Sequence, residues 1–170
     1  MNVKSLQPIA FVVSLLGLLG LLWVNLATLF GKAAPFEVSF FSIFLSLFPL
    51  WAFTIVYLQK TRPAIPEAEA NQMSKLQQIQ YYLGNPPNWA MIALALFYAY
   101  MLYSAFLYLN GGSVDPEYVN GQYQFFNHGN ITYFTEEEYQ VQHRLHLRSI
   151  TGGFMGFFAV STVALGPWGR

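Results

Sequence analysis

Residues 9–30 read IAFVVSLLGLLGLLWVNLATLF, and this stretch decides the fold. Its 22 residues include no charged side chain, and the ordinary polar ones are Ser14, Asn25 and Thr28. An α-helix of this length rises about 33 Å, which matches the roughly 30 Å hydrocarbon core of a bilayer. Helices buried in soluble proteins are usually shorter and carry charges on an outer stripe. The stretch therefore predicts a retained transmembrane helix, since it is too long for the apolar core of a signal peptide.

Three further segments of similar length also lack charged residues: 38–58, 89–109 and 149–168. The composition agrees with four spans, because 55% of the chain is hydrophobic and 9% is charged, against about 25% charged in a soluble domain. We expect an all-α integral membrane protein in which residues 1–170 form a single membrane domain with four transmembrane helices.

Lys and Arg are distributed unequally over the short connections, and this bias predicts the orientation. With an even number of spans, both termini and the connection 59–88 share one side, which carries five of these residues, whereas the other side carries three. Both termini are therefore expected to be cytoplasmic, in the cytoplasmic (inner) membrane of a prokaryote. Trp89 and Trp168 lie at span ends on this same side, as aromatic belt residues do.

The connection between the second and third spans is expected to contain an interfacial helix on the cytoplasmic side. Met73, Leu76, Ile79 and Leu83 recur at helical spacing, which is typical of an amphipathic helix lying on a membrane surface. Gly84 follows this pattern and is suited to end the helix.

The connection between the third and fourth spans, about 111–148, is the largest part outside the predicted membrane. Residues 123–126 and 131–134 flank the turn sequence Asn-His-Gly-Asn, which predicts an extracytoplasmic β-hairpin. Thr135 and Glu138 form a capping-box pattern. We therefore expect a helix that begins near Glu136 and continues without a break into the fourth span.

Several classes of function are disfavoured by composition. The eight basic and eight acidic residues balance, so nothing favours a nucleic-acid partner. The absence of cysteine excludes disulfides and thiol catalysis. No Asp, Glu, Lys, Arg or His lies within the four predicted spans, which disfavours ion-coupled transport and haem ligation there. No catalytic motif is present either, so we expect no cofactor and favour a protein that is not an enzyme.

The three histidines all lie in the region after the third span, and they are the candidate metal ligands. His143 and His146 are three residues apart on one predicted helix, and His128 at the hairpin tip is a possible third ligand. No carboxylate stands within one turn on the same face to support them. The alternative interpretation is that these histidines, together with Tyr139, seat the hairpin against the helix.

Arg144 and Arg148 lie four residues apart at the predicted water boundary of the fourth span. Guanidinium groups there suit lipid phosphates or a carboxylate ligand, and the alternative interpretation is that they mark the membrane boundary. We predict lipid or ligand contact for both arginines.

Small and hydroxyl-bearing residues mark the surfaces on which helices are expected to pack. The predicted packing residues are Gly17, Gly20, Ser42, Ser46, Gly152 and Gly156. Ser42 and Ser46 continue a stripe from Ser39, and the third span carries Tyr100, Ser104 and Tyr108. Two such stripes facing each other predict assembly, and a quinone or lipid pocket lined by the tyrosines is an alternative.

The leading hypothesis is a non-catalytic accessory or assembly component of a membrane complex, with the external hairpin as its recognition element. Its expected partners are the lipid bilayer and either another membrane protein or further copies of itself. A membrane enzyme or sensor with a metal or small-ligand site at the outer surface is the alternative. An oligomeric channel lined by the serine stripe is the third hypothesis.

Overall fold

The computed structural model describes residues 3–32, 40–110, 117–127 and 129–168, and it is 74% helical. Four of its helices are long and apolar enough to cross a membrane, which confirms the expected mostly helical fold with four candidate spans. These helices are α1 (Val3–Leu29), α2 (Phe40–Thr61), α5 (Asn88–Leu109) and α6 (Glu136–Leu165).

Several helix ends differ from the expected spans, and α2 ends at Thr61 rather than at residue 58. α1 begins at Val3 rather than at residue 9, and it continues through Pro8. α6 ends at Leu165 rather than at residue 168, because Gly166 is extended (ψ 160°). Pro167 follows directly and disfavours the helical conformation for the residue before it.

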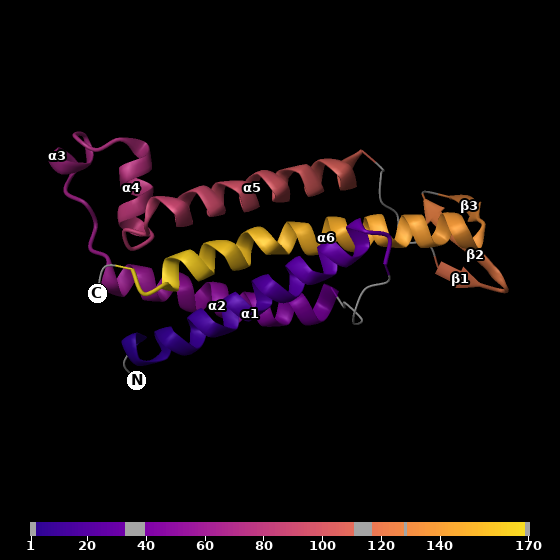
Figure 1. The fold of residues 1–170 in the computed structure, drawn as a ribbon, viewed down its shortest axis with the longest axis horizontal. Helices are drawn as coiled ribbons and strands as arrows, with labels where there is room; N and C mark the ends of the chain where they lie inside the picture. Colours follow the sequence, from indigo (N-terminus) through magenta and orange to yellow (C-terminus); the bar gives the residue numbers. More distant parts are fainter. Residues whose placement is uncertain (1–2, 33–39, 111–116, 128, 169–170) are drawn as a thin grey trace.

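α6 is the central helix of the bundle (Figure 1). It packs most extensively against α1 and α5 and then against α2, and α1 also contacts α2. In its most apolar stretch 61% of the residues are buried, compared with 28% in α1, 22% in α2 and 11% in α5. The exposed apolar surface of the bundle is therefore supplied mainly by the three outer helices.

The two ends of the bundle carry different elements (Figure 1). At one end, here called the terminal end, α1 begins and α6 finishes, and Gln7 Nε2 donates a hydrogen bond of 2.6 Å to the Leu165 carbonyl. Trp89 and Trp168 meet edge to face at this end, with ring centroids 5.4 Å apart. Trp168 Nε1 also donates to the Val163 carbonyl at 2.7 Å.

The connection between α2 and α5 contains two short helices, α3 (Glu67–Ala70) and α4 (Lys75–Tyr82). α4 is the expected amphipathic helix, and a capping box between Ser74 and Gln77 starts it. Gly84 has φ +94°, and its amide donates to Tyr81 while the next amide donates to Gln80. This Schellman arrangement ends the helix at the expected glycine. The single turn of α3 was not anticipated.

The opposite end, here called the sheet end, carries three strands rather than the expected two-stranded hairpin. β1 (Glu117–Val119), β2 (Gln122–Asn127) and β3 (Asn130–Phe134) form an antiparallel sheet in that order. The additional strand is joined to β2 by Asn120 and Gly121, whose φ angles are 52° and 85°. Asn-Gly is the preferred pair for such a hairpin turn, so this dipeptide was the signal that would have identified β1.

α6 begins at Glu136 as expected, after the Thr135–Glu138 capping box, and continues unbroken to Leu165. Its 30 residues exceed the about 20 needed to cross a bilayer. The first turns of α6 consequently extend past the ends of α1 and α5, and the sheet lies beside them (Figure 1).

Candidate functional site

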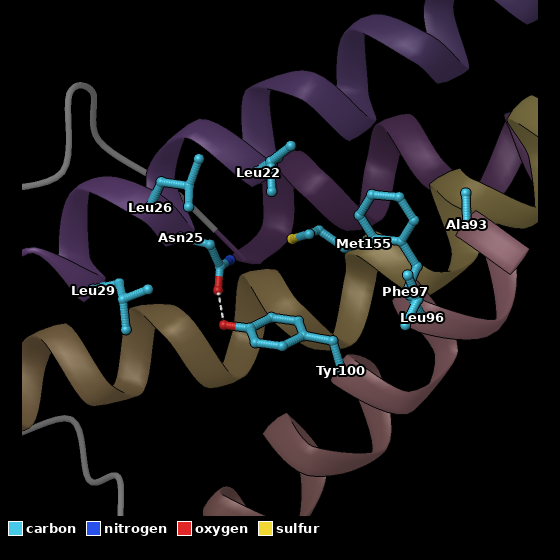
Figure 2. Close-up of a pocket in the computed structure, with 9 residues that line it drawn as sticks. All are labelled: Leu22, Asn25, Leu26, Leu29, Ala93, Leu96, Phe97, Tyr100 and Met155. Atoms are coloured by element: carbon cyan, nitrogen blue, oxygen red, sulfur yellow. Dashed lines mark hydrogen bonds between the residues drawn. The ribbon is translucent and has the colours of Figure 1, made fainter.

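A hydrogen-bonded polar cluster lies inside the bundle and joins three helices (Figure 2). The Tyr100 hydroxyl of α5 donates to Asn25 Oδ1 of α1 at 2.6 Å. Asn25 Nδ2 donates to Thr151 Oγ1 of α6 and, at 3.3 Å, to the Leu21 carbonyl. Asn25 and Thr151 are 3% and 0% exposed. Asn25 is therefore the point at which α1, α5 and α6 are held together by polar contacts.

A cavity of about 300 Å³ adjoins this cluster between α1 and α5 (Figure 2). A second cavity of about 320 Å³ shares Ala93 and Phe97 with it and extends to Trp89 and Trp168. Met155 and Ala159 of α6 contribute to the two linings. Together the cavities form an apolar groove between α1 and α5, in which Asn25 and Tyr100 supply hydrogen-bonding groups.

The residues expected to line a quinone or lipid pocket are only partly brought together. Tyr100 lines the groove, but its hydroxyl is engaged by Asn25. Ser104 is 2% exposed and lies against Gly152 of α6. The side chain of Tyr108 is outside the described part of the structure. The groove is mainly apolar, and a quinone or lipid pocket lined by the tyrosines stays a prediction.

Other buried polar groups in the spans also bond within the chain. Thr54 donates to the Leu50 carbonyl at 2.7 Å and lies 3.4 Å from Ser161 Oγ. Thr162 Oγ1 and Ser14 Oγ are 3.2 Å apart. Hydrocarbon provides no hydrogen-bonding groups, so these internal partners make the burial of the hydroxyls tolerable.

The glycines expected at helix contacts occupy different surroundings. A Cβ atom on Gly152 would overlap the Ser104 hydroxyl, and one on Gly156 would lie 2.5 Å from Met101 Sδ. A Cβ atom on Gly17 would overlap the Phe158 ring. These three glycines allow α6 to approach α5 and α1 closely. Gly20, in contrast, would have nothing within 4 Å of an added Cβ.

The serines expected at helix contacts lie on the outer surface of α2. Ser42 and Ser46 are exposed, and the Ser46 hydroxyl donates to the Ile43 carbonyl at 2.8 Å. Such a bond to its own helix allows a serine to face lipid. A role between chains stays a prediction, and Ser39 lies outside the described residues.

Four rings lie in a row at the sheet end, joined by one tilted and two stacked contacts. The Tyr118 and Tyr123 centroids are 4.7 Å apart, Tyr123 and Tyr139 are 4.3 Å apart, and Tyr139 and His143 are 5.6 Å apart. Two effects raise the pKa of Tyr123 above its ordinary value. Desolvation among these rings is the larger, and the negative charge of the Glu136 carboxylate is the next. The contact between Tyr123 and Tyr139 joins the sheet to α6, and His143 stacks on Tyr139 along the same helix.

The predicted metal ligands are not assembled by the part of the chain that the structure describes. His143 stacks on Tyr139, whereas His146 lines a groove of about 710 Å³ between α5 and α6. His128 lies outside the described residues. Among those described, no three His, Asp or Glu side chains form a group that could hold a metal ion. The three-histidine site stays a prediction.

Arg144 and Arg148 are half-buried on α6. The Nε atom of Arg148 is buried and has no hydrogen-bond partner within the described ranges. Contact of both arginines with lipid phosphate stays a prediction.

The outer face of the sheet displays apolar side chains that sequence reasoning did not single out. Phe126 and Ile131 are paired directly across β2 and β3, and Tyr133 pairs with Gln124 on the same face. Tyr123, on the other face, contacts α6 through Tyr139. Phe126, Ile131 and Tyr133 are 67%, 48% and 59% exposed. Apolar residues on both faces of β2 were the signal for this surface, here called the sheet patch.

Comparisons with protein-family models, with curated proteins and with solved structures find no match to this chain.

Proposed function

We propose that this chain is a non-catalytic accessory or assembly component of a membrane complex, and that the sheet patch recognises its protein partner. The proposal places the protein in the cytoplasmic membrane of a prokaryote, with both termini cytoplasmic and the sheet outside. The observation that carries it is the exposure of Phe126, Ile131 and Tyr133 on one sheet face.

The location of the sheet patch favours a protein partner over lipid. The sheet lies beside the part of α6 that extends past α1 and α5, so its outer face is in water when the four helices span a bilayer (Figure 1). Contiguous aromatic and aliphatic side chains in water are energetically unfavourable, and they commonly mark protein interaction sites. Aromatic residues are also enriched at the centres of protein interfaces.

The attachment of the sheet supports the same proposal. Its inner face stacks through Tyr123 on Tyr139 of α6, and α6 is the most buried helix of the bundle. A partner would thus meet a surface whose position is already set before binding, which lowers the entropic cost of association. Asn25 bonds to Tyr100 and Thr54 lies within bonding distance of Ser161, and such contacts between helices support a structural frame.

Affinity capture from mild detergent, with chemical crosslinking in intact membranes, tests the proposal. The tagged chain is compared with the Phe126→Ser/Ile131→Ser double variant. Leu76→Ser is the matched control, because Leu76 is 58% exposed but lies on α4, away from the sheet. We expect a stoichiometric partner that is captured by the wild type and the control and lost in the double variant.

Two results would contradict the proposal. The first is a wild-type chain that runs as a monomer, without a copurifying or crosslinked protein. The second is a partner captured equally by the double variant. Far-UV circular dichroism of each variant distinguishes loss of the surface from loss of the fold.

A further inference from the structure

A separate cavity of about 420 Å³ lies at the terminal end, away from the sheet patch. It is lined by Lys4, Gln7, Tyr57, Thr61 and Arg62. These residues come from the start of α1 and from the last turns of α2 and the residue that follows it. The cavity therefore lies where two spans reach the water boundary, which is the depth of lipid headgroups.

The described residues that line the cavity include two cations and no carboxylate. Tyr57 and Thr61 add hydroxyl groups, and the Thr61 hydroxyl donates to the Tyr57 carbonyl at 2.7 Å, which leaves its oxygen able to accept. Ammonium and guanidinium groups form charge-assisted hydrogen bonds with the oxygen atoms of anions. The charge of this cavity is complementary to a monoanion or dianion.

Arg62 lines this cavity and lies close to the turn after α4. Its Nε atom is buried and has no hydrogen-bond partner among the residues that the structure describes. Its Nη2 atom lies close to Gly84, where an added Cβ would be 2.8 Å away. Gly84 also has φ +94°, so a side chain is disfavoured there on two grounds. The turn after α4 thus leaves room for a guanidinium whose Nε–H lacks an acceptor.

We propose that this cavity, here called the basic cavity, binds the phosphate of an anionic phospholipid. A guanidinium fork pairs with phosphate oxygens in two-point geometry, and an ammonium group adds a second charge. Basic pockets between transmembrane helices at the membrane boundary are suited to such headgroups. Further into the spans, α1 and α2 expose apolar side chains, among them Ile9 and Val56, beside which acyl chains can lie.

The test uses the purified full chain, stripped of lipid in a mild detergent. Binding of short-chain phosphatidylglycerol, phosphatidylcholine and inorganic phosphate is measured by native mass spectrometry and by the shift in thermal stability. The variants are Lys4→Gln and Arg62→Gln, together with Arg62→Lys, which keeps the charge but removes the fork. Lys75→Gln is the matched control, since Lys75 is exposed on α4 and does not line the cavity.

We expect the wild type to bind phosphatidylglycerol at least about tenfold more tightly than phosphatidylcholine. Loss of one cation near a membrane surface should weaken binding about fivefold. Lys4→Gln and Arg62→Gln should each show this loss, Arg62→Lys a smaller one, and the control none. Raising the salt concentration should weaken binding to the wild type, which tests the charge dependence even if a variant does not fold.

The proposal is overturned if the two phospholipids bind equally, if both glutamine variants bind like the wild type, or if salt has no effect. Inorganic phosphate that binds as tightly as phosphatidylglycerol would overturn the lipid assignment and make the cavity a site for soluble phosphate.

Discussion

Replacing Asn25 with leucine should destabilise the helix bundle, although leucine is the more apolar residue. The change removes two contacts between helices, the one accepted from Tyr100 and the one donated to Thr151. Interhelical hydrogen bonds in membranes contribute about 0.6 kcal/mol on average and up to about 1.7 kcal/mol. We therefore expect Asn25→Leu to lower the free energy of unfolding by about 1–3 kcal/mol.

A double-mutant cycle isolates the contribution of the bond between Asn25 and Tyr100. The cycle combines Asn25→Leu with Tyr100→Phe, and unfolding is followed by circular dichroism as SDS is added to mixed micelles. A coupling energy of about 0.6–1.7 kcal/mol is expected, because each single change removes the same hydrogen bond. Tyr98→Phe is the matched control, since Tyr98 lies on the same helix but is 48% exposed.

The result that refutes this reasoning is a coupling energy of zero within about 0.3 kcal/mol, the limit within which independent sites add. An Asn25→Leu variant as stable as the wild type would refute it as well. In either case Asn25 would not hold the three helices together, and its burial would need another explanation.

Two further predictions concern α6. Gly152→Ala should lower the free energy of unfolding by about 1–3 kcal/mol, because the added Cβ would overlap Ser104. Gly153→Ala on the same helix is the control and should be tolerated, since nothing lies within 4 Å of its added Cβ. SDS unfolding compares the two variants, and equal losses of stability would contradict the predicted contact. Hydrogen bonds from the Thr135 amide and hydroxyl lower the pKa of Glu138. The resulting stabilisation is fully present above the pKa that Glu138 has in the unfolded chain. It is lost as the pH falls through the lower pKa that Glu138 has in the folded chain. The rate of amide hydrogen exchange in the first turn of α6, corrected for intrinsic rates, should therefore rise at acidic pH in the wild type but not in Glu138→Gln. The same pH dependence in both proteins would contradict a stabilising role for the Glu138 carboxylate.

Some helix starts and ends could be predicted from the sequence because they depend only on residues that are close together in the chain. The Thr135–Glu138 cap and the glycine that ends α4 are local patterns, and both are found at the expected places. The Asn120–Gly121 turn was equally local and was overlooked. The sheet patch depends on strand register, which places Phe126 opposite Ile131.

The arrangement of polar groups inside the bundle was not predictable in the same way. Asn25 was visible only as one of three polar residues in an apolar run, and Thr151 was not singled out. Their contact with Tyr100 joins residues from three helices. Lys4 and Arg62 likewise come from different helices, and only packing brings them to one cavity.

The sequence by itself determined which segments are apolar enough to enter a membrane, where α6 begins, and where α4 ends. Hydropathy and helix caps are properties of contiguous residues, so they can be identified without the fold. The tertiary structure decided that α6 is central, that Ser42 and Ser46 face outward, and that Asn25 meets Tyr100. The physical reason is that a helix in lipid is apolar on every side, as α5 is, so hydrophobic periodicity does not specify which face packs.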